Sequence, residues 1–165
     1  MRLSATVLTR LARMNNHFLN RRLAYRIGVA GTLPFLILML ACWLVQIDSL
    51  AYFLRGQLAY GIAILSFLGG VHWSAALLSG ELSEEQTRKA FVWSVLPPVI
   101  AWSATLMGGF GFAMLMAGFI GAYQVDKRLF AWYRMPSWFL QLRLRLTCAV
   151  VAALALSVIA ANVRG

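Results

Sequence analysis

Acidic side chains are the scarcest chemical class in this sequence. Its 165 residues include 5 Asp and Glu against 15 Lys and Arg; 12% are charged and 61% are hydrophobic. Soluble domains carry about 25% charged residues, so this composition excludes an ordinary soluble fold. The basic excess could suit nucleic acid, but the Lys and Arg residues gather at the ends of apolar runs, as membrane-flanking charges do. We therefore expect an integral membrane protein that contacts the lipid bilayer and no nucleic acid.

Cysteine and histidine are also scarce. Cys42 and Cys148 stand alone in two apolar runs, and His17 and His72 are the only histidines. The sequence therefore offers no disulfide framework, no Cys or His spacing for a metal ion, and no evident set of Ser, His and Asp for nucleophilic catalysis. We predict no catalytic residue, no metal site and no cofactor, and we expect that the protein is not an enzyme.

Long apolar runs are what the sequence does contain. Residues 58–79 would span about 33 Å as a helix, enough to cross a hydrocarbon core of about 30 Å. Residues 90–125 carry no charge but would measure about 54 Å, so we expect a turn at Gly108 and Gly109 to divide them. The sequence predicts an all-α integral membrane protein, with one five-helix transmembrane domain over residues 27–165. Its predicted helices cover residues 27–47, 58–79, 90–107, 109–125 and 146–163.

Small residues recur every four positions on two of these helices. Apolar helices gain little by leaving lipid, so small residues that allow close backbone approach mark where helices meet. We predict two packing stripes: Ser66, Gly70 and Ser74 beside Gly69, and Ala113, Ala117 and Gly121. Proline lacks a backbone N–H and bends a helix, so kinks are expected at Pro34, Pro97 and Pro98.

Residues 1–26 are predicted to form a separate arm. They contain six arginines and no acid, and apolar residues recur along one helical face. These residues are Leu3, Val7, Leu11, Met14 and Phe18. Such a segment is typical of a basic amphipathic helix lying in the interface of an anionic membrane, and a mitochondrial presequence has a similar composition. Both readings, a retained arm and a cleaved one, stay open.

Two polar residues, His72 and Gln124, lie inside or at the edge of predicted spans. Gln124 shares the small-residue stripe of helix 109–125, which is first a packing seam. His72 is either a neutral, hydrogen-bonded imidazole that supports packing, or a proton-responsive or ligand-binding group near the bilayer midplane. No acidic residue lies well inside any predicted span to pair with it.

The segment Leu-Ser-Phe-Leu-Gly-Gly-Val-His-Trp at residues 65–73 carries a resemblance. Together with residues 31–35 and 138–143, it resembles an uncharacterised family of small multi-helix membrane proteins from proteobacteria, which has a mitochondrial transmembrane relative in animals. The likeness covers most of the chain from residue 28 onward. It implies an integral inner-membrane protein without an assigned biochemical role, and it implies no catalytic residue.

The distribution of Lys and Arg predicts the orientation. In a five-helix arrangement one side receives 13 of them and the other receives Arg55 and Arg164. The positive-inside rule then puts the N-terminus in the bacterial cytoplasm and the C-terminus in the periplasm, or places the chain in the mitochondrial inner membrane with the N-terminus in the matrix. The leading functional hypothesis is a non-enzymatic accessory or assembly component that packs against another membrane protein or itself. The alternative is a small carrier or proton pathway that uses His72.

Overall fold

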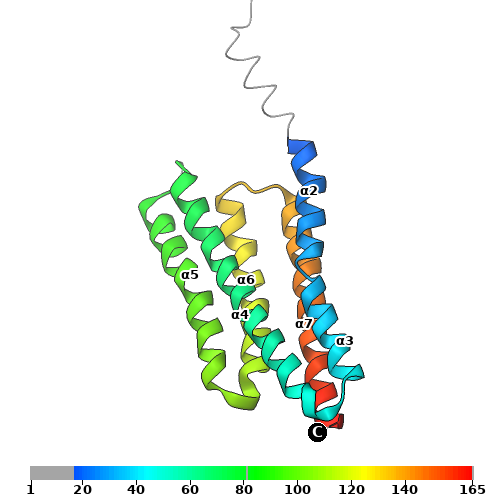
Figure 1. Ribbon diagram of the computed structural model, residues 1–165. Helices are drawn as coiled ribbons and strands as arrows, with labels where there is room; N and C mark the ends of the chain where they lie inside the picture. The colour runs from blue at the N-terminus through cyan, green and yellow to red at the C-terminus, as the bar shows by residue number, and fades with distance from the viewer. Residues whose placement is uncertain (1–16, 81, 165) are drawn as a thin grey trace, which may run out of the picture. The chain divides into compact units, whose positions relative to one another are not determined.

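A computed structural model describes residues 17–80 and 82–164 as helices joined by short connections (Figure 1). The elements are α2 (His17–Ala30), α3 (Leu33–Leu44), α4 (Ile47–Leu78), α5 (Glu84–Ser103), two short 3₁₀ helices (Ala104–Leu106 and Gly108–Phe110), α6 (Gly111–Trp132) and α7 (Ser137–Arg164). The predicted arm over residues 1–26 lies mostly outside these described residues. The chain divides into two compact units, residues 1–31 and 32–165. In the first unit, the Arg21 guanidinium lies over the Tyr25 ring.

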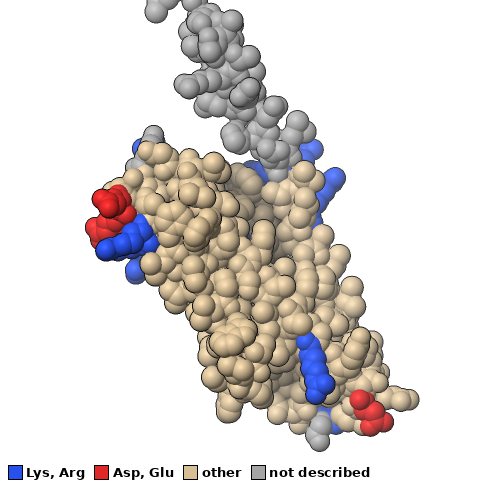
Figure 2. All heavy atoms as spheres, turned by 60° about the vertical axis from the view of Figure 1, so that its left-hand side comes forward, with Lys and Arg blue, Asp and Glu red and all other residues tan. Residues whose placement is uncertain are grey.

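Five helices among the described residues are long and apolar enough to cross a membrane. They are Arg21–Leu44, Ile47–Leu78, Glu84–Leu106, Gly108–Trp132 and Ser137–Arg164. The all-helical class and the five membrane-spanning helices predicted from the sequence are therefore confirmed. Large apolar side chains such as Ile37, Phe67 and Leu156 are exposed on the outside. Figure 2 shows that uncharged residues form the middle of one face, which suits contact with acyl chains.

The helices start and stop for identifiable local reasons. Helix α5 begins with a capping box, in which the Ser83 side chain accepts from the Gln86 N–H and the Gln86 side chain accepts from the Ser83 N–H. Gly108, which has φ +52°, provides the left-handed turn between α5 and α6 that the Gly-Gly pair predicted. Arg134 has φ 53° in the connection between α6 and α7.

The bend expected inside helix 27–47 is instead an interruption ahead of Pro34. Helix α2 ends at Ala30 and α3 begins at Leu33, so Pro34 lies in the first turn of α3. Proline is favoured there because the first helical N–H groups have no intrahelical acceptor, and the N–H that Pro34 lacks is the one that would continue α2 by donating to the Ala30 carbonyl. Helix α5, by contrast, continues through both Pro97 and Pro98.

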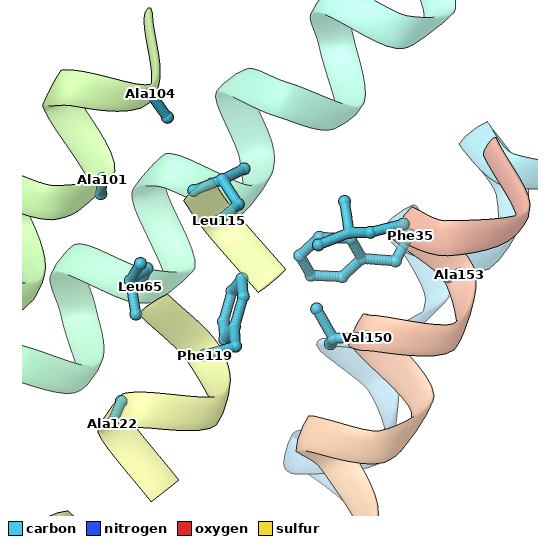
Figure 3. Close-up of a cluster of buried hydrophobic side chains, with 10 residues drawn as sticks. Phe35, Leu65, Ala101, Ala104, Leu115, Phe119, Ala122, Val150 and Ala153 are labelled. Carbon is cyan, nitrogen blue, oxygen red and sulfur yellow. The ribbon is translucent and has the colours of Figure 1, made fainter. Parts of the chain in front are cut away.

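The core of the second unit lies where α3, α4, α5, α6 and α7 meet, and α4 contacts each of the other four. Figure 3 shows side chains from these helices converging on one cluster. The Phe35 and Phe119 rings meet edge to face with centroids 6.1 Å apart, and Leu65 and Leu115 are fully buried beside them. This apolar layer holds the bundle together in its middle.

Glycines allow α4 to approach its neighbours closely in this layer. A Cβ placed on Gly69 would lie 2.4 Å from the Ser94 carbonyl oxygen and 2.8 Å from Cδ of Pro98. Pro98 has no N–H to donate, so the Ser94 carbonyl lacks its usual helical partner and the α4 backbone approaches it directly. A Cβ on Gly118 of α6 would lie 2.6 Å from a Leu65 methyl carbon.

Candidate functional site

Three ionisable side chains from three helices meet inside the bundle: His72 of α4, Asp126 of α6 and Arg143 of α7. His72 Nε2 lies 2.8 Å from Asp126 Oδ1. Arg143 donates from Nε to Asp126 Oδ2 over 2.8 Å, and its Nη2 lies 2.6 Å from the same oxygen. His72 is 2% exposed, Asp126 1% and Arg143 7%. We call these three residues the charged network.

The hydrogen-bonding roles in the charged network follow from the acceptor character of a carboxylate. An ionised Asp126 only accepts, so Nε2 of His72 must carry the hydrogen of this bond. Nδ1 of a neutral His72 is then an acceptor, and it is buried with no hydrogen-bond partner among the described residues. With a neutral His72, the charges of an ionised Asp126 and of Arg143 cancel.

Each member lies about the same distance from one end of its helix. His72 precedes the last residue of α4 by 6 positions (78 − 72), Asp126 precedes that of α6 by 6 (132 − 126), and Arg143 follows the first residue of α7 by 6 (143 − 137). At 1.5 Å per residue each lies about 9 Å from its helix end. The end of α6 and the start of α7 lie together because a short connection joins them. The C-terminal end of α4 lies at the same end of the bundle, as Figure 1 shows.

The place of His72 along its helix differs from the one that the predicted span implied. Helix α4 starts at Ile47 rather than at residue 58, so its centre falls near Ile62. Ten residues separate Ile62 from His72, which places the imidazole about 15 Å from the helix centre. The charged network therefore lies toward the end of the bundle that carries the α6–α7 connection.

Aromatic rings cover the network. The His72 ring centroid lies 5.5 Å from that of Phe130 and 6.0 Å from that of Tyr133. The Tyr133 hydroxyl is buried and has no hydrogen-bond partner among the described residues. Burial, and then the negative charge of Asp126, raise the pKa of Tyr133 to about 12. The phenol therefore stays protonated throughout the neutral range.

The expected packing stripe on α4 is displaced by one position. Gly69 is buried and makes the close contact with α5, whereas Gly70 is exposed, with nothing within 4 Å of a Cβ placed on it. Ser74 is also exposed and Ser66 is half-buried. The buried face of α4 instead carries Gln57, Gly61, Leu65, Gly69, His72 and Ala76. Within this chain, Gly70 is therefore not at a helix contact.

The stripe on α6 shows the same displacement. Ala113, Ala117 and Gln124 are exposed, and a Cβ on Gly121 would meet nothing within 4 Å. The buried residues Leu115, Gly118, Ala122 and Asp126 define the inner face. Gln124 therefore contributes nothing to a polar interior site, and the acid two residues later does.

Among the buried polar residues that were absent from the sequence-based candidates are Gln57, Asp126 and Arg143. Asp126 and Arg143 were assigned to an interfacial loop, and Gln57 to the connection before residue 58. The structure places Gln57 at 0% exposure, where its Nε2 donates to the Phe35 carbonyl over 3.1 Å. Asp126 is the only acid after Glu85, and it follows Ala122 by four residues on the face that contains Gly118. That spacing was the available signal.

The described residues hold no group of three or more His, Cys, Asp or Glu side chains that could hold a metal ion. Chemically, the charged network keeps the His72 imidazole in hydrogen-bond contact with a buried carboxylate. It also joins α4, α6 and α7 through bonds that require one relative placement of the three helices.

The fold and its interior define a multi-pass helical membrane protein, and comparison with known proteins extends this class to a family. Residues 20–159 match the family described as protein of unknown function (DUF3429). The chain belongs to that family. It is also similar to Transmembrane protein 69 of Xenopus tropicalis, at 32% identity over 148 residues that cover 85% of this chain and 55% of the frog protein. The chain thus spans about half the length of this relative. No solved structure matches it.

Proposed function

We propose that this protein is a non-enzymatic accessory or assembly component that packs against another membrane protein. The observation that carries the proposal is that both carboxylate oxygens of Asp126 bind side chains of the same chain. An acid engaged in this way holds helices together and leaves no free carboxylate for a substrate. The charged network therefore acts as an internal support for an outer surface that makes the functional contact.

The outer surface of α4 is the place where a partner helix can approach. Gly70 is exposed between half-buried Ser66 and exposed Ser74, one turn away on either side. Small residues give lipid little contact area but let a helix backbone come close. Because a side chain at position 70 meets nothing in this chain, the surface can be altered without disturbing the bundle.

Gly70→Leu tests this role. We expect the variant to accumulate at the normal level, since nothing lies within 4 Å of the new Cβ. A membrane protein that co-purifies stoichiometrically with the unaltered chain in mild detergent, and that cross-links to a cysteine introduced at position 74, should be lost. Phe67→Leu, at an exposed apolar position, is the matched control. Absence of any stoichiometric partner, or full retention of the partner by Gly70→Leu, would count against the proposal.

The charged network also favours a second candidate, a small carrier or proton pathway. His72 is buried with its Nε2 2.8 Å from Asp126 Oδ1, and ionisable residues inside a transmembrane bundle are characteristic of proton and ion pathways. Liposomes containing only this protein should then show solute or proton flux. His72→Gln keeps a donor and an acceptor but does not titrate near neutrality, so it should abolish flux while the protein still accumulates.

We also propose a bacterial inner membrane, with the N-terminus cytoplasmic and the C-terminus periplasmic, as the location. The support is the resemblance of residues 65–73 and the count of 13 Lys and Arg on one side against 2 on the other. The mitochondrial inner membrane is the alternative. A reporter fused to the C-terminus that is active only in the cytoplasm would contradict the bacterial orientation.

A further inference from the structure

The connected helices α6 and α7 carry an uncompensated basic surface. Residues 111–145 contain five Lys and Arg and a single acid, Asp126. Both oxygens of that acid are held inside the bundle by His72 and Arg143, and Asp126 is only 1% exposed. Its negative charge is therefore already paired inside the bundle. The exposed cations Lys127, Arg128 and Arg145 have no second acid on their own helices to pair with.

Three of these cations point outward: Lys127 and Arg128 of α6, and Arg145 of α7. We call them the hairpin cations. Lys127 lies over the Tyr123 ring at 5.3 Å, and among the described residues none of the three makes an ion pair. Arg128 lies 4 residues before the end of α6 (132 − 128), and Arg145 follows the start of α7 by 8 (145 − 137). They therefore lie about 6 to 12 Å inside the helix ends.

The uncharged apolar runs of α6 and α7 end near that depth, as is expected where a helix enters the headgroup layer. Trp132 and Trp138, near the ends of α6 and α7, are the residue type that anchors helices at the interface. Lys and Arg at such positions keep their stems along apolar surface and extend their charges toward the headgroups. Leu144, which is 42% exposed beside Arg145, supplies apolar surface directly next to a cation.

We propose that the hairpin cations form a binding site for the headgroups of acidic phospholipids. The negative phosphate supplies the charge that Asp126 cannot, and the acyl chains cover the exposed apolar residues on the same helices. Ile120 at 46% and Leu144 at 42% exposure are such residues. The pairing of cations with exposed apolar surface is what favours a lipid over a free anion.

Native mass spectrometry of the detergent-purified, full-length protein tests the site. The probes are palmitoyl-oleoyl phosphatidylglycerol and its zwitterionic counterpart, phosphatidylcholine. A basic residue near the membrane surface contributes about fivefold to acidic-lipid affinity, so the triple variant Lys127→Gln, Arg128→Gln, Arg145→Gln should bind phosphatidylglycerol on the order of 100-fold more weakly. Its binding of phosphatidylcholine should not change.

The control removes three exposed cations elsewhere, through Arg55→Gln, Arg88→Gln and Lys89→Gln. It should keep phosphatidylglycerol affinity within about threefold. If the triple variant does not fold, Arg128→Gln and Arg145→Gln are measured singly, with about a fivefold loss expected for each. Any of three results would overturn the proposal. The hairpin variants could keep their phosphatidylglycerol affinity, the control could lose as much affinity as they do, or millimolar inorganic phosphate could displace the lipid.

Discussion

The apolar middle of the bundle and its charged end solve the same packing problem by different means. In the middle, Gly69 and Gly118 let backbones and side chains approach closely around Leu65 and Phe119. At the end, the charged network joins three helices through bonds of 2.6 to 2.8 Å. The middle depends mainly on the shape complementarity of apolar side chains, whereas the charged end depends on one acid with two partners.

The difference shows what each region contributes in lipid. Apolar contacts gain little from transfer out of lipid, so the middle depends on close fit, which tolerates some sliding of apolar surfaces. The charged network does not allow such sliding, because another register would leave a buried charge without its partner. We expect the middle to supply most of the packing and the charged end to set the register.

The largest expected effect comes from a side chain that blocks the close contact between α4 and α5. In Gly69→Leu the new Cβ would lie 2.4 Å from the Ser94 carbonyl oxygen, a backbone atom that cannot move without displacing α5. We expect nearly complete loss of the monodisperse species in size-exclusion chromatography of detergent extracts. Gly70→Leu, one residue away on the exposed face, should elute normally. Similar profiles for both variants would contradict the assignment of the inner face.

Removing the acid that the charged end depends on should cost nearly as much. Asp126→Ala leaves Arg143 and His72 without their carboxylate, and breaking a buried ion pair in this way costs about 3–5 kcal/mol. Reversible unfolding in mixed detergent micelles, followed by circular dichroism, measures the change. Gln124→Ala, at an exposed position on the same helix, should shift stability by no more than about 0.5 kcal/mol. If both variants lost the same free energy of unfolding, the network would add no stability beyond that of an exposed residue on the same helix.

A cavity in the apolar middle should have an effect of intermediate size. Leu115 is fully buried, and one of its methyl carbons would lie 2.7 Å from a Cβ placed on Gly61. Leu115→Ala removes these contacts, for which soluble cores lose about 2–5 kcal/mol. We expect the lower half of that range, since the transfer contribution is small in lipid. Ile120→Ala on the outer face of α6 is the control for the same unfolding measurement.

The helical class and the five spans could be predicted from the sequence because they depend on length and apolar content. The helix ends could not, because helices continue beyond the hydrocarbon. Predicted spans ended at residue 125 and began at 146, where charges appear. The structure extends α6 to Trp132 and starts α7 at Ser137. Hydropathy marks the apolar layer, whereas backbone hydrogen bonding continues through the interface.

The candidate site was only partly predictable for the same reason. His72 stood out as an ionisable residue inside an apolar run, but Asp126 and Arg143 lay where the apolar runs stop. Their pairing depends on which faces of α4, α6 and α7 turn inward. Small residues every four positions marked the stripe of Ser66, Gly70 and Ser74 on α4, and nothing in that spacing showed that Gly69 is buried instead of Gly70. In the structure, the face of α4 that turns inward is the one that carries larger side chains such as Leu65.

The smallest expected effect comes from a change at Tyr133, whose ring lies beside His72 at the charged end. The Tyr133 hydroxyl is buried and lacks a hydrogen-bond partner among the described residues, so Tyr133→Phe removes a desolvated group while it keeps the ring beside His72. We expect stability at pH 7 to stay within about 0.5 kcal/mol of the unaltered protein or to rise slightly. A loss above about 1 kcal/mol would mean that the hydroxyl is bonded within the network.

The pH dependence separates these outcomes further. The pKa of Tyr133 is raised to about 12 in the folded chain, against an ordinary value of 10.0. The folded state therefore holds this proton more tightly than the unfolded state does. Its contribution to stability is fully present below pH 10 and is lost as the pH rises through about 12. Unfolding measured from pH 9 upward should thus show a steeper decline for the unaltered protein than for Tyr133→Phe. Parallel declines would show that Tyr133 ionises as an exposed phenol does.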